Sequence, residues 1–372
     1  MDFSFTPEQD EAAELAARIL ADRATPERMR AVEQDGDRFD RDLWRDLGEA
    51  GMLGLALPEE HGGAGLAILE LCRVLVEVGR KVAPVPLAFH GPAARLVAEH
   101  GSPEQQAAWL PGAASGASVL TAAVAEDRSF APERPTTVAS RGGDGSGWVL
   151  TGAKAVVPAG PYADLLLVPA DTPDGVGVFL VRPDDAGVTL TPQAFTDGDR
   201  VARLELAGAA LPADRLLGSA DGTVDRRLRQ LLVLAAAAEQ LGVTEGALAL
   251  TATYAKTREQ FGRPIGTFQA VSQRLADGYI DVLGQRLTLW QAAWRLSEGL
   301  PADSEVAIAK LWAADAGHRL AHTTVHVHGG VGIDLDGEAH RYFTTAKRFE
   351  FLHGGATEQA LLIGRHLAAE PA

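Results

Sequence analysis

The chain has 372 residues, of which 46% are hydrophobic and 23% are charged. This is the composition of an ordinary soluble globular protein, long enough for two or three domains. The formal charge of −16 argues against nucleic acid or an anionic membrane surface as the main partner. A single cysteine, Cys72, excludes an intrachain disulfide and fits a reducing compartment, so we expect a cytoplasmic protein.

The N-terminal residues 1–8 contain neither a basic stretch nor an apolar run, so we expect no secretory signal. No segment reaches eighteen uninterrupted apolar residues, and we therefore expect no membrane span.

Residues 1–118 are expected to form a helical domain. Thr6, Pro7 and Glu8 combine a capping threonine, a proline at the first helical position and an acidic first turn, which together predict a helix start. Further helices are expected over 39–51, 66–80 and 92–100. The glycine-rich stretch 57–65 lacks the preceding strand and the lysine of a P-loop, so we interpret it as a structural loop.

Between residues 119 and 217 the pattern changes to short β-rich runs separated by glycine and proline. Strands are expected at 148–150, 165–169, 176–181, 188–191 and 203–206. Short strands with a turn signal about every ten residues are typical of a β-barrel or sandwich, so this region is predicted to be a separate middle domain.

Residues 225–372 are expected to be helical again. Leucines at helical spacing predict a first helix from about Arg226 to the 256–266 stretch, where Gly262, Pro264 and Gly266 break it. A second helix is expected near Phe268 and a third over 304–322, followed by a loop over 326–332. The corner between the first two helices carries two arginines and two phenylalanines, which suits a flat anionic ligand; an ordinary interhelical turn is the alternative.

The corner sequence TREQFGRPIGTFQAV, residues 257–271, resembles the R-x-x-F-G-x-x-I-x-x-x-Q signature of the acyl-CoA dehydrogenase family. The resemblance covers nearly the whole chain. It implies an α+β fold with an N-terminal all-α domain, a middle β-domain and a C-terminal four-helix bundle. It also implies FAD as cofactor, shared between the subunits of an oligomer. By this resemblance Arg258 would face the FAD pyrophosphate of a neighbouring subunit, Phe261 its flank, and Gln269 would supply a polar contact.

The stretch HVHGGVG, residues 326–332, resembles the G-G-x-G loop of the same family. The resemblance implies that Gly329 and Gly330 approach the FAD diphosphate, where a side chain would hold the backbone away. His326 would take the place of a family glutamine. A zinc site is the alternative, because His318, His322 and His326 are four residues apart. The chain has no HExxH pattern and no ligand placed to complete such a set, so we expect no metal.

The activity that the resemblance implies is FAD-dependent α,β-dehydrogenation of an acyl-CoA thioester, which requires a base for the α-proton. His353 falls where the family carries its glutamate. Some members carry the base on an earlier helix, at a position that is Leu232 here. Glu239 lies two turns after Leu232 on roughly the same face and is the second candidate. The structural alternatives are a buried hydrogen bond or salt bridge across a subunit contact for Glu239 and a hydrogen-bonding loop residue for His353.

The middle domain departs from the family. Residues 125–129 only partly represent the family's T-E-P-x-x-G-S-D turn. In the stretch 154–158, Val156 lacks the indole expected beside the flavin, and Pro158 lacks both the hydroxyl and the backbone N–H expected near it. Three hypotheses remain open: an active acyl-CoA dehydrogenase; a non-catalytic subunit that completes the FAD site of a second dehydrogenase subunit in a heterotetramer; and a flavoenzyme acting on a carrier-protein-bound acyl group.

Overall fold

The computed structural model describes residues 4–36, 38–143 and 147–369. Residues 1–3, part of the segment on which the absence of a secretory signal was predicted, lie outside the described residues. The chain divides into two compact units. The helical unit comprises residues 1–34, 72–84 and 233–372, and the sheet unit comprises residues 35–71 and 85–232. The division into three domains at 118 and 217–225 stays a prediction.

The helical unit begins with α1 (Pro7–Arg23) and α2 (Pro26–Gln34) and includes most of α4 (Ile68–Lys81). The predicted start of α1 is confirmed. The Thr6 hydroxyl accepts a hydrogen bond from the Gln9 backbone N–H at 3.3 Å, and the Gln9 side chain accepts one from Thr6 at 3.0 Å. This reciprocal capping box satisfies two backbone donors that the helix itself leaves unpaired.

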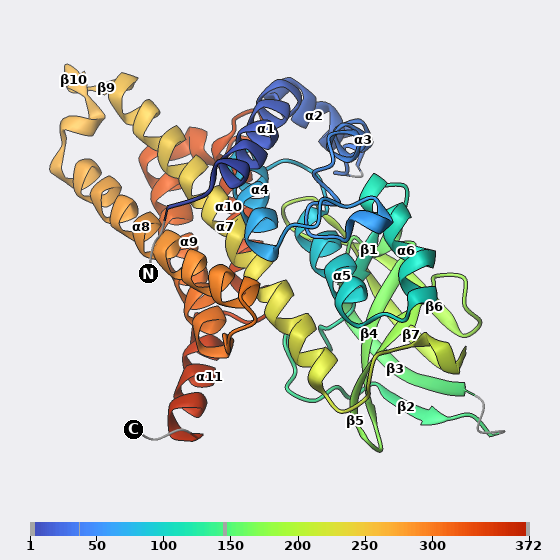
Figure 1. Cartoon of the computed structure of the whole chain (residues 1–372). Helices are drawn as coiled ribbons and strands as arrows, with labels where there is room; N and C mark the ends of the chain where they lie inside the picture. The colour runs from blue at the N-terminus through green and yellow to red at the C-terminus, as the bar shows by residue number, and fades with distance from the viewer. Residues whose placement is uncertain (1–3, 37, 144–146, 370–372) are drawn as a thin grey trace. The chain divides into compact units, whose positions relative to one another are not determined.

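The remainder of the helical unit is a bundle built on the C-terminal helices. They are α7 (Thr223–Thr257), which belongs to this unit from Val233 onward, α8 (Gln269–Ser297), α9 (Asp303–His328), α10 (Ala339–Phe351) and α11 (Ala356–Ala369), with the short helix η5 (Gly329–Ile333) after α9. Helix α9 packs against α8, α10 and α11. In Figure 1, α7 and α8 run side by side to the corner that joins them.

Close contact between α4 and α7 depends on glycine. A Cβ atom at Gly242 would lie 2.0 Å from the Val76 carbonyl oxygen, and one at Gly79 would lie 2.0 Å from the Glu239 carbonyl oxygen. Both distances are far inside van der Waals contact, so a side chain at either position would push the two helices apart.

The sheet unit places helices beside one mixed sheet. The helices are α3 (Arg41–Glu49), η1 (Glu59–His61), α5 (Leu87–His100) and α6 (Pro103–Ser115). The sheet order is β6-β7-β3-β2-β4-β5-β8, with β1 paired in parallel to β4. The strands are β1 (Leu120–Ala122), β2 (Val138–Arg141), β3 (Gly147–Pro158), β4 (Leu165–Thr172), β5 (Gly175–Val181), β6 (Val188–Ala194), β7 (Arg200–Pro212) and β8 (Leu216–Leu217).

All five predicted strands are present, and the first is much longer than predicted because β3 continues to Pro158 along β7. The core of the sheet includes Trp148 and Phe179, whose rings meet edge to face at 5.2 Å.

In the same unit, His90 of α5 is fully buried between α6 and β1. Burial lowers the pKa of His90 to about 4, so its ring is neutral at pH 7 and bridges the Ala113 carbonyl and the Leu120 N–H.

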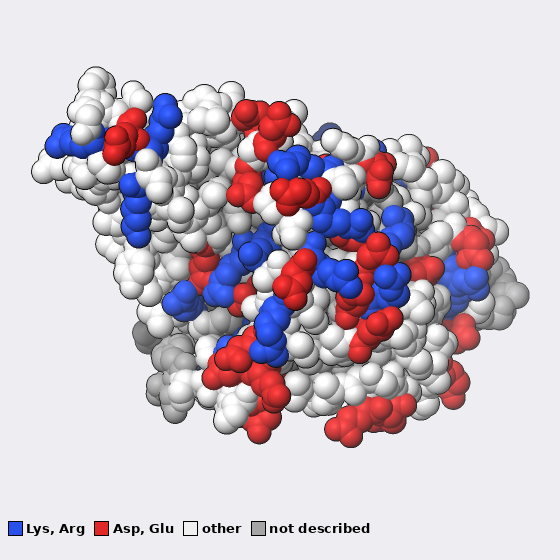
Figure 2. Space-filling view, turned by 90° about the horizontal axis from the view of Figure 1, so that it is seen from above, with Lys and Arg blue, Asp and Glu red and all other residues white. Residues whose placement is uncertain are grey.

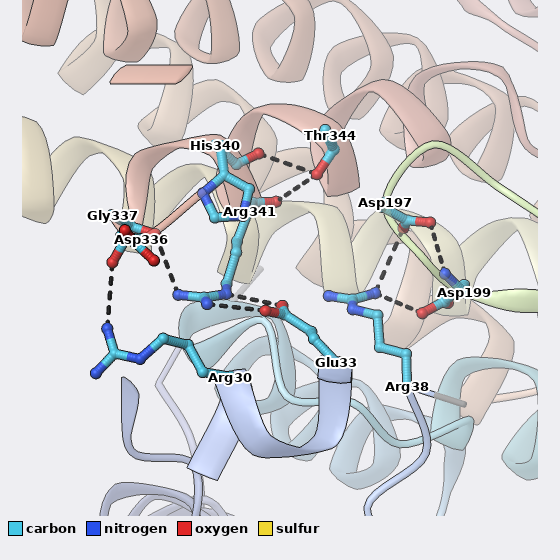
Figure 3. A network of polar contacts seen from close by, with 10 residues as sticks. All are labelled: Arg30, Glu33, Arg38, Asp197, Asp199, Asp336, Gly337, His340, Arg341 and Thr344. Atoms are coloured by element: carbon cyan, nitrogen blue, oxygen red, sulfur yellow. Dashed lines mark hydrogen bonds and ion pairs between the residues drawn. The ribbon is translucent and has the colours of Figure 1, made fainter. Parts of the chain in front are cut away.

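Ion pairs connect distant segments inside each unit, as Figure 3 shows. In the helical unit, Arg341 of α10 makes two 2.8 Å hydrogen bonds to the Glu33 carboxylate of α2, and Arg30 donates to the Asp336 carbonyl at 3.2 Å. In the sheet unit, Arg38 pairs with Asp197 and Asp199. Such bidentate and networked pairs hold the N-terminal segments to later parts of the chain.

Helix α7 is long and apolar enough to cross a membrane by length and composition, a property that was not predicted from the sequence. Within the structure, however, 83% of its apolar window is buried, as in the core helix of a folded bundle. The side chain of Cys72 on α4 is fully buried.

Candidate functional site

The corner between α7 and α8 is a small hairpin. Strands β9 (Glu259–Gln260) and β10 (Arg263–Pro264) pair antiparallel and are joined by Phe261 and Gly262. Both turn residues have positive φ, +54° and +76°, as two-residue hairpins prefer. For a bulky residue such as Phe261 this conformation is strained, and the residue is 92% exposed. A strained, exposed aromatic residue is a candidate contact with something outside the chain.

Positive charge gathers at this corner. Residues 254–275 contain one acidic residue, Glu259, and four basic ones, Lys256, Arg258, Arg263 and Arg274. The left end of the surface in Figure 2, over the β9–β10 corner of Figure 1, accordingly shows blue side chains. The Arg258 side chain is exposed and makes no hydrogen bond or ion pair with another described residue. The corner therefore offers donors to an anion in a chain whose overall charge is negative.

The structure brings the ends of α7 and α9 together. The Tyr254 ring stacks on the His328 ring with centroids 4.3 Å apart, and one turn earlier the Thr251 and Thr324 hydroxyls lie 3.1 Å apart. Arg258 follows Tyr254 by one helical turn, and Gly329 directly follows His328. The two motifs singled out in the sequence, 71 residues apart from Arg258 to Gly329, therefore emerge from neighbouring helix ends.

Gly329 and Gly330 differ in whether the chain's own conformation and packing require glycine at that position. Gly329 has φ +65° and ψ −141°, a conformation open essentially to glycine alone. Gly330 has no positive φ, and a Cβ built on it meets no atom of the described residues within 4 Å. Nothing within the described chain thus requires glycine at 330. A ligand that approaches the backbone closely would require it.

His326 and Gln269 are both exposed, at the last turn of α9 and at the first residue of α8. The predicted loop over 326–332 is wrong, because His326 to His328 still belong to α9 and the residues from Gly329 onward form the short helix η5. The helix continues because Val327 and His328 pack into the bundle.

The turn between α10 and α11 holds His353 in a defined backbone. His353 has φ +60°, and its side chain is 7% exposed. The Gln359 side-chain amide donates to the His353 carbonyl at 3.1 Å, and the Glu358 carboxylate accepts from the Gly355 N–H at 2.5 Å. The turn is therefore fixed from the α11 side.

Lys310 fixes the same turn from the α9 side. Its Nζ atom is fully buried and donates to the Phe349 and Glu350 carbonyl oxygens at 2.7 and 3.2 Å, at the C-terminal end of α10. Burial lowers the pKa of Lys310 to about 7, partly offset by the charges of Glu358 and Glu350. Lys310 was not predicted as a site residue, although a lysine within the apolar run 306–314 was a visible signal.

Glu239, the other candidate base, is 4% exposed in α7. Its carboxylate lies 3.9 Å from a guanidinium nitrogen of Arg348 on α10. A buried ion pair is therefore present, but it lies within the chain and not across a subunit contact, and the catalytic role of Glu239 stays a prediction.

In the sheet unit, the residues that depart from the family signature, within 125–129 and 154–158, contact other residues of the same unit. Glu126 accepts hydrogen bonds from the backbone and hydroxyl groups of Thr136 and Thr137 and from Lys154, whose Nζ is 2.8 Å away. Burial alone would raise the pKa of Glu126, but these bonds outweigh it and lower the pKa to about 2. Glu126 therefore faces the interior of the sheet unit.

The next residues of β3 are also paired within the sheet unit. Val156 bridges to Ala125, and the Pro158 carbonyl accepts a 2.6 Å hydrogen bond from the Thr121 hydroxyl. Pro158 has no N–H to donate, and Val156 has no ring to stack. This stretch offers a flavin neither the aromatic surface nor the donor that the family signature contains.

The histidines considered as zinc ligands make other contacts. His318 Nδ1 lies 3.1 Å from each Glu350 carboxylate oxygen, and its ring lies 4.6 Å from that of His322. Within the described residues, no group of three or more His, Cys, Asp or Glu side chains is arranged to hold a metal ion.

Two family profiles match this chain. "Acyl-CoA dehydrogenase, N-terminal domain" matches residues 6–117, and "Acyl-CoA dehydrogenase, C-terminal domain" matches residues 233–368. Acyl-CoA dehydrogenase FadE27 of Mycobacterium tuberculosis is 49% identical over 381 residues, covering all of both chains. The chain belongs to the acyl-CoA dehydrogenase family.

Solved structures agree. A chain of the ChsE4-ChsE5 complex from Mycobacterium tuberculosis matches with a TM-score of 0.94 and 49% identity over all of both chains. A chain of a variant of the Tcur3481-Tcur3483 steroid ACAD matches with a TM-score of 0.91 and 43% identity, covering 97% of this chain and 98% of that one. The predicted fold is confirmed: an N-terminal helical domain, a central sheet and a C-terminal helical domain. This acyl-CoA dehydrogenase is an oxidoreductase of the FAD-dependent class that acts on acyl-CoA.

The two units fit FAD unequally. In the helical unit, the unpaired Arg258 guanidinium and the open backbone at Gly330 suit a pyrophosphate. In the sheet unit, Val156 and Pro158 do not supply the groups that the family presents to its flavin. The helical unit of this acyl-CoA dehydrogenase thus presents groups that suit a pyrophosphate, whereas the β3 stretch lacks the groups that the family signature contains.

Proposed function

We propose that this chain is one subunit of a heteromeric acyl-CoA dehydrogenase and that it completes the FAD site of a second, related subunit. The contrast between the two units carries this proposal. The helical unit carries an exposed cationic corner at Arg258 and a glycine, Gly330, whose backbone another molecule could approach. In the sheet unit, the stretch 154–158 that would face a flavin makes contacts with the chain itself.

The names of its relatives point the same way. The chains that match at 49% and 43% identity come from two-protein assemblies, the ChsE4-ChsE5 complex and the Tcur3481-Tcur3483 steroid ACAD. Those names describe the relatives, and they support a two-component assembly for this chain. From the second name we take a bulky acyl-CoA, such as a steroid side-chain thioester, as the proposed substrate, and we propose the cytoplasm as its location.

Within this assembly the chain's part is binding and orientation. Arg258 would pair with the FAD pyrophosphate, Phe261 would cover the cofactor's flank, and Gly329 and Gly330 would admit the diphosphate to the backbone. His326 and Gln269 would supply polar contacts at its rim. Bound FAD supplies the hydride acceptor for α,β-dehydrogenation of the thioester.

A second candidate function is favoured by the turn at His353. His353 has a positive φ, and side chains from α9 and α11 fix the turn around it. A strained backbone fixed in this way is typical of a position under functional constraint. In that case the chain would itself carry a base, either His353 or Glu239, and would bind flavin without a partner.

The deciding experiment is the visible spectrum of the protein purified alone and after co-expression with a candidate second acyl-CoA dehydrogenase subunit from the same organism. We expect little or no flavin in the chain alone and stoichiometric FAD in the complex. Stoichiometric FAD and thioester oxidation by the chain alone would exclude the proposal in favour of the second candidate.

Two arginine variants, one at the corner and one as a control, make this test more specific. Arg258→Gln should lower the flavin content of the complex, because a charge-assisted contact with the pyrophosphate is lost, with an expected weakening of about 10- to 100-fold. Arg18→Gln is the matched control, since Arg18 is an exposed arginine of α1 in the same unit. Equal flavin loss in both variants would remove Arg258 from the site.

A further inference from the structure

His328 is the last residue of α9 and directly precedes Gly329. Its Nδ1 atom lies 2.8 Å from the Thr324 carbonyl oxygen, one turn earlier in the same helix, and the residue is 9% exposed. A carbonyl oxygen can only accept a hydrogen bond, so Nδ1 carries the proton, and this bond fixes the orientation of the ring. The sequence pattern pointed to His326 in this motif and not to His328.

The fixed ring of His328 stacks on Tyr254 of α7. The two ring planes are 22° apart and their centroids are 4.3 Å apart. About one turn earlier in both helices, the Thr251 and Thr324 hydroxyls lie 3.1 Å apart, and both residues are fully buried. Stacked rings fix the spacing between the helices. The hydroxyl pair opposes sliding of one helix along the other, because a slip would break a buried hydrogen bond.

Each ring is joined by a short length of backbone to one of the two segments assigned to FAD. The Arg258 N–H donates to the Tyr254 carbonyl at 2.8 Å, and the Arg258 carbonyl accepts from the Ile265 N–H at 2.8 Å, which closes the corner. On the other helix a single peptide bond joins His328 to Gly329. The stack therefore connects the corner to the glycine loop through one helical turn on one side and one peptide bond on the other.

We propose that His328 is a positioning residue: by stacking on Tyr254, its ring holds the Gly329–Gly330 backbone at the spacing from Arg258 that the FAD pyrophosphate requires. The inference rests on the proposed function, because FAD is the group that both segments are assigned to hold. A displacement of about 1 Å between groups that hold one ligand can weaken their joint action by up to about 100-fold. His328 therefore affects FAD binding without touching the cofactor.

The first test compares two replacements of His328 in the co-expressed complex. His328→Leu keeps an apolar side chain of similar size but removes the ring, and it should weaken FAD binding about tenfold or more. His328→Phe keeps a ring that can stack on Tyr254, and it should bind FAD within about threefold of wild type. Release of FAD on dilution, followed by flavin fluorescence, measures both. The proposal is overturned if His328→Leu binds FAD as wild type does, or if His328→Phe is as weak as His328→Leu.

Leu320→Ala separates positioning from a general loss of stability. Leu320 lies in the same helix, is 1% exposed and packs toward α8, where a Cβ atom at Gly278 would lie 2.6 Å from its Cδ1 atom. This variant should lower the denaturation midpoint more than His328→Leu does, because it leaves a cavity in the core. It should nevertheless bind FAD within about threefold of wild type. Equal loss of FAD in both variants would show that any weakening of the bundle releases the cofactor, which overturns the proposal.

Tyr254→Leu tests the other ring of the stack. It should weaken FAD binding as much as His328→Leu does, and the double variant should be little worse than either single variant, since each one alone removes the stack. Losses that multiply in the double variant would mean that the two rings act independently, and the assigned contact would be wrong.

The second test measures the spacing in the chain alone, without cofactor or partner. Lys256 and Ile333 are exposed and follow the two stacked residues in sequence. Cys72 is the only cysteine and is fully buried, so cysteines introduced at 256 and 333 would be the accessible sites for nitroxide labels. Electron paramagnetic resonance should give one narrow distance distribution with His328, a broader one with His328→Leu and a narrow one again with His328→Phe. An unchanged distribution in His328→Leu would overturn the proposal.

The two proposals can fail separately. If the wild-type complex contains FAD and the His328→Leu complex retains it equally well, the positioning role is wrong and the heteromeric function stands. If no second subunit brings FAD to the wild-type chain, the heteromeric function fails, and the distance measurement still decides whether His328 sets the spacing of the two segments.

Discussion

The corner around Arg258 and the β3 stretch around Lys154 both align with sequence signatures of the same family, yet they are built in opposite ways. The corner is exposed, positively charged and strained at Phe261, and an added side chain at Gly330 would meet open space. The β3 stretch is closed on itself, with Lys154 and Glu126 buried against each other. The difference teaches that the corner keeps polar groups available to another molecule, whereas the polar groups of the β3 stretch stabilise the sheet unit itself.

The largest expected effect is on the closed stretch. Lys154→Met should destabilise the protein by about 3 kcal/mol or more, because Glu126 would be left buried without its cation. Chemical denaturation measures this, and Lys81→Met is the control, since Lys81 is exposed. If Lys154→Met instead lowers the flavin content of the complex without destabilising the protein, the β3 stretch would serve FAD binding and not the stability of the sheet unit.

At the glycine loop we expect the opposite: a small effect on stability and a large effect on FAD retention. Gly330→Leu should change the stability of the chain by less than about 0.5 kcal/mol, since the side chain would project into open space. The same change should lower FAD retention by the complex about 100-fold, because the diphosphate could no longer reach the backbone.

Gly332→Ala is the matched control for that variant. A Cβ atom at Gly332 would lie 2.8 Å from the Val325 carbonyl oxygen, so this change should cost about 1–3 kcal/mol of stability. If Gly330→Leu behaves like Gly332→Ala, the loop is a structural element and the corner loses its assigned role.

Glu239 tests whether catalysis lies on this chain. Glu239→Gln should destabilise the protein by about 2 kcal/mol, because Arg348 loses a buried counter-charge, while turnover by the complex stays within about threefold of wild type. Steady-state kinetics of the complex and thermal denaturation measure the two effects. Turnover that falls by about two orders of magnitude or more would instead make Glu239 the base.

Lys310 gives a smaller, pH-dependent effect. Its folded-state pKa of about 7 lies well below the ordinary value near 10.4, so between these values the unfolded chain binds more protons than the folded one. Stability should therefore rise with pH across this window, by about 1 kcal/mol per pH unit, and Lys310→Met should remove this rise. Denaturation at pH 7, 8 and 9 measures the slope. A wild-type slope equal to that of the variant would show that Lys310 stays charged throughout.

Much of the fold was predictable because its signals are local. The cap at Thr6, the breakers at 262–266 and the alternating runs of the sheet each act within a few residues, and the elements they predict are present. The end of α9 was placed too early, because the packing of Val327 and His328 into the bundle extends the helix. The family signatures in the corner and the glycine loop also survive as contiguous residues, so the sequence identified them directly.

The sequence by itself determined the fold class, the FAD-binding family and the residues of the corner, since these are written in short stretches of chain. Only the tertiary structure decided that Tyr254 stacks on His328, that Glu126 turns inward to Lys154, and that Lys310 lies buried under the His353 turn. Each of these contacts joins residues 28 to 74 positions apart. Their proximity follows from how helices and strands pack, and packing depends on the whole set of side chains that must fill the interior together.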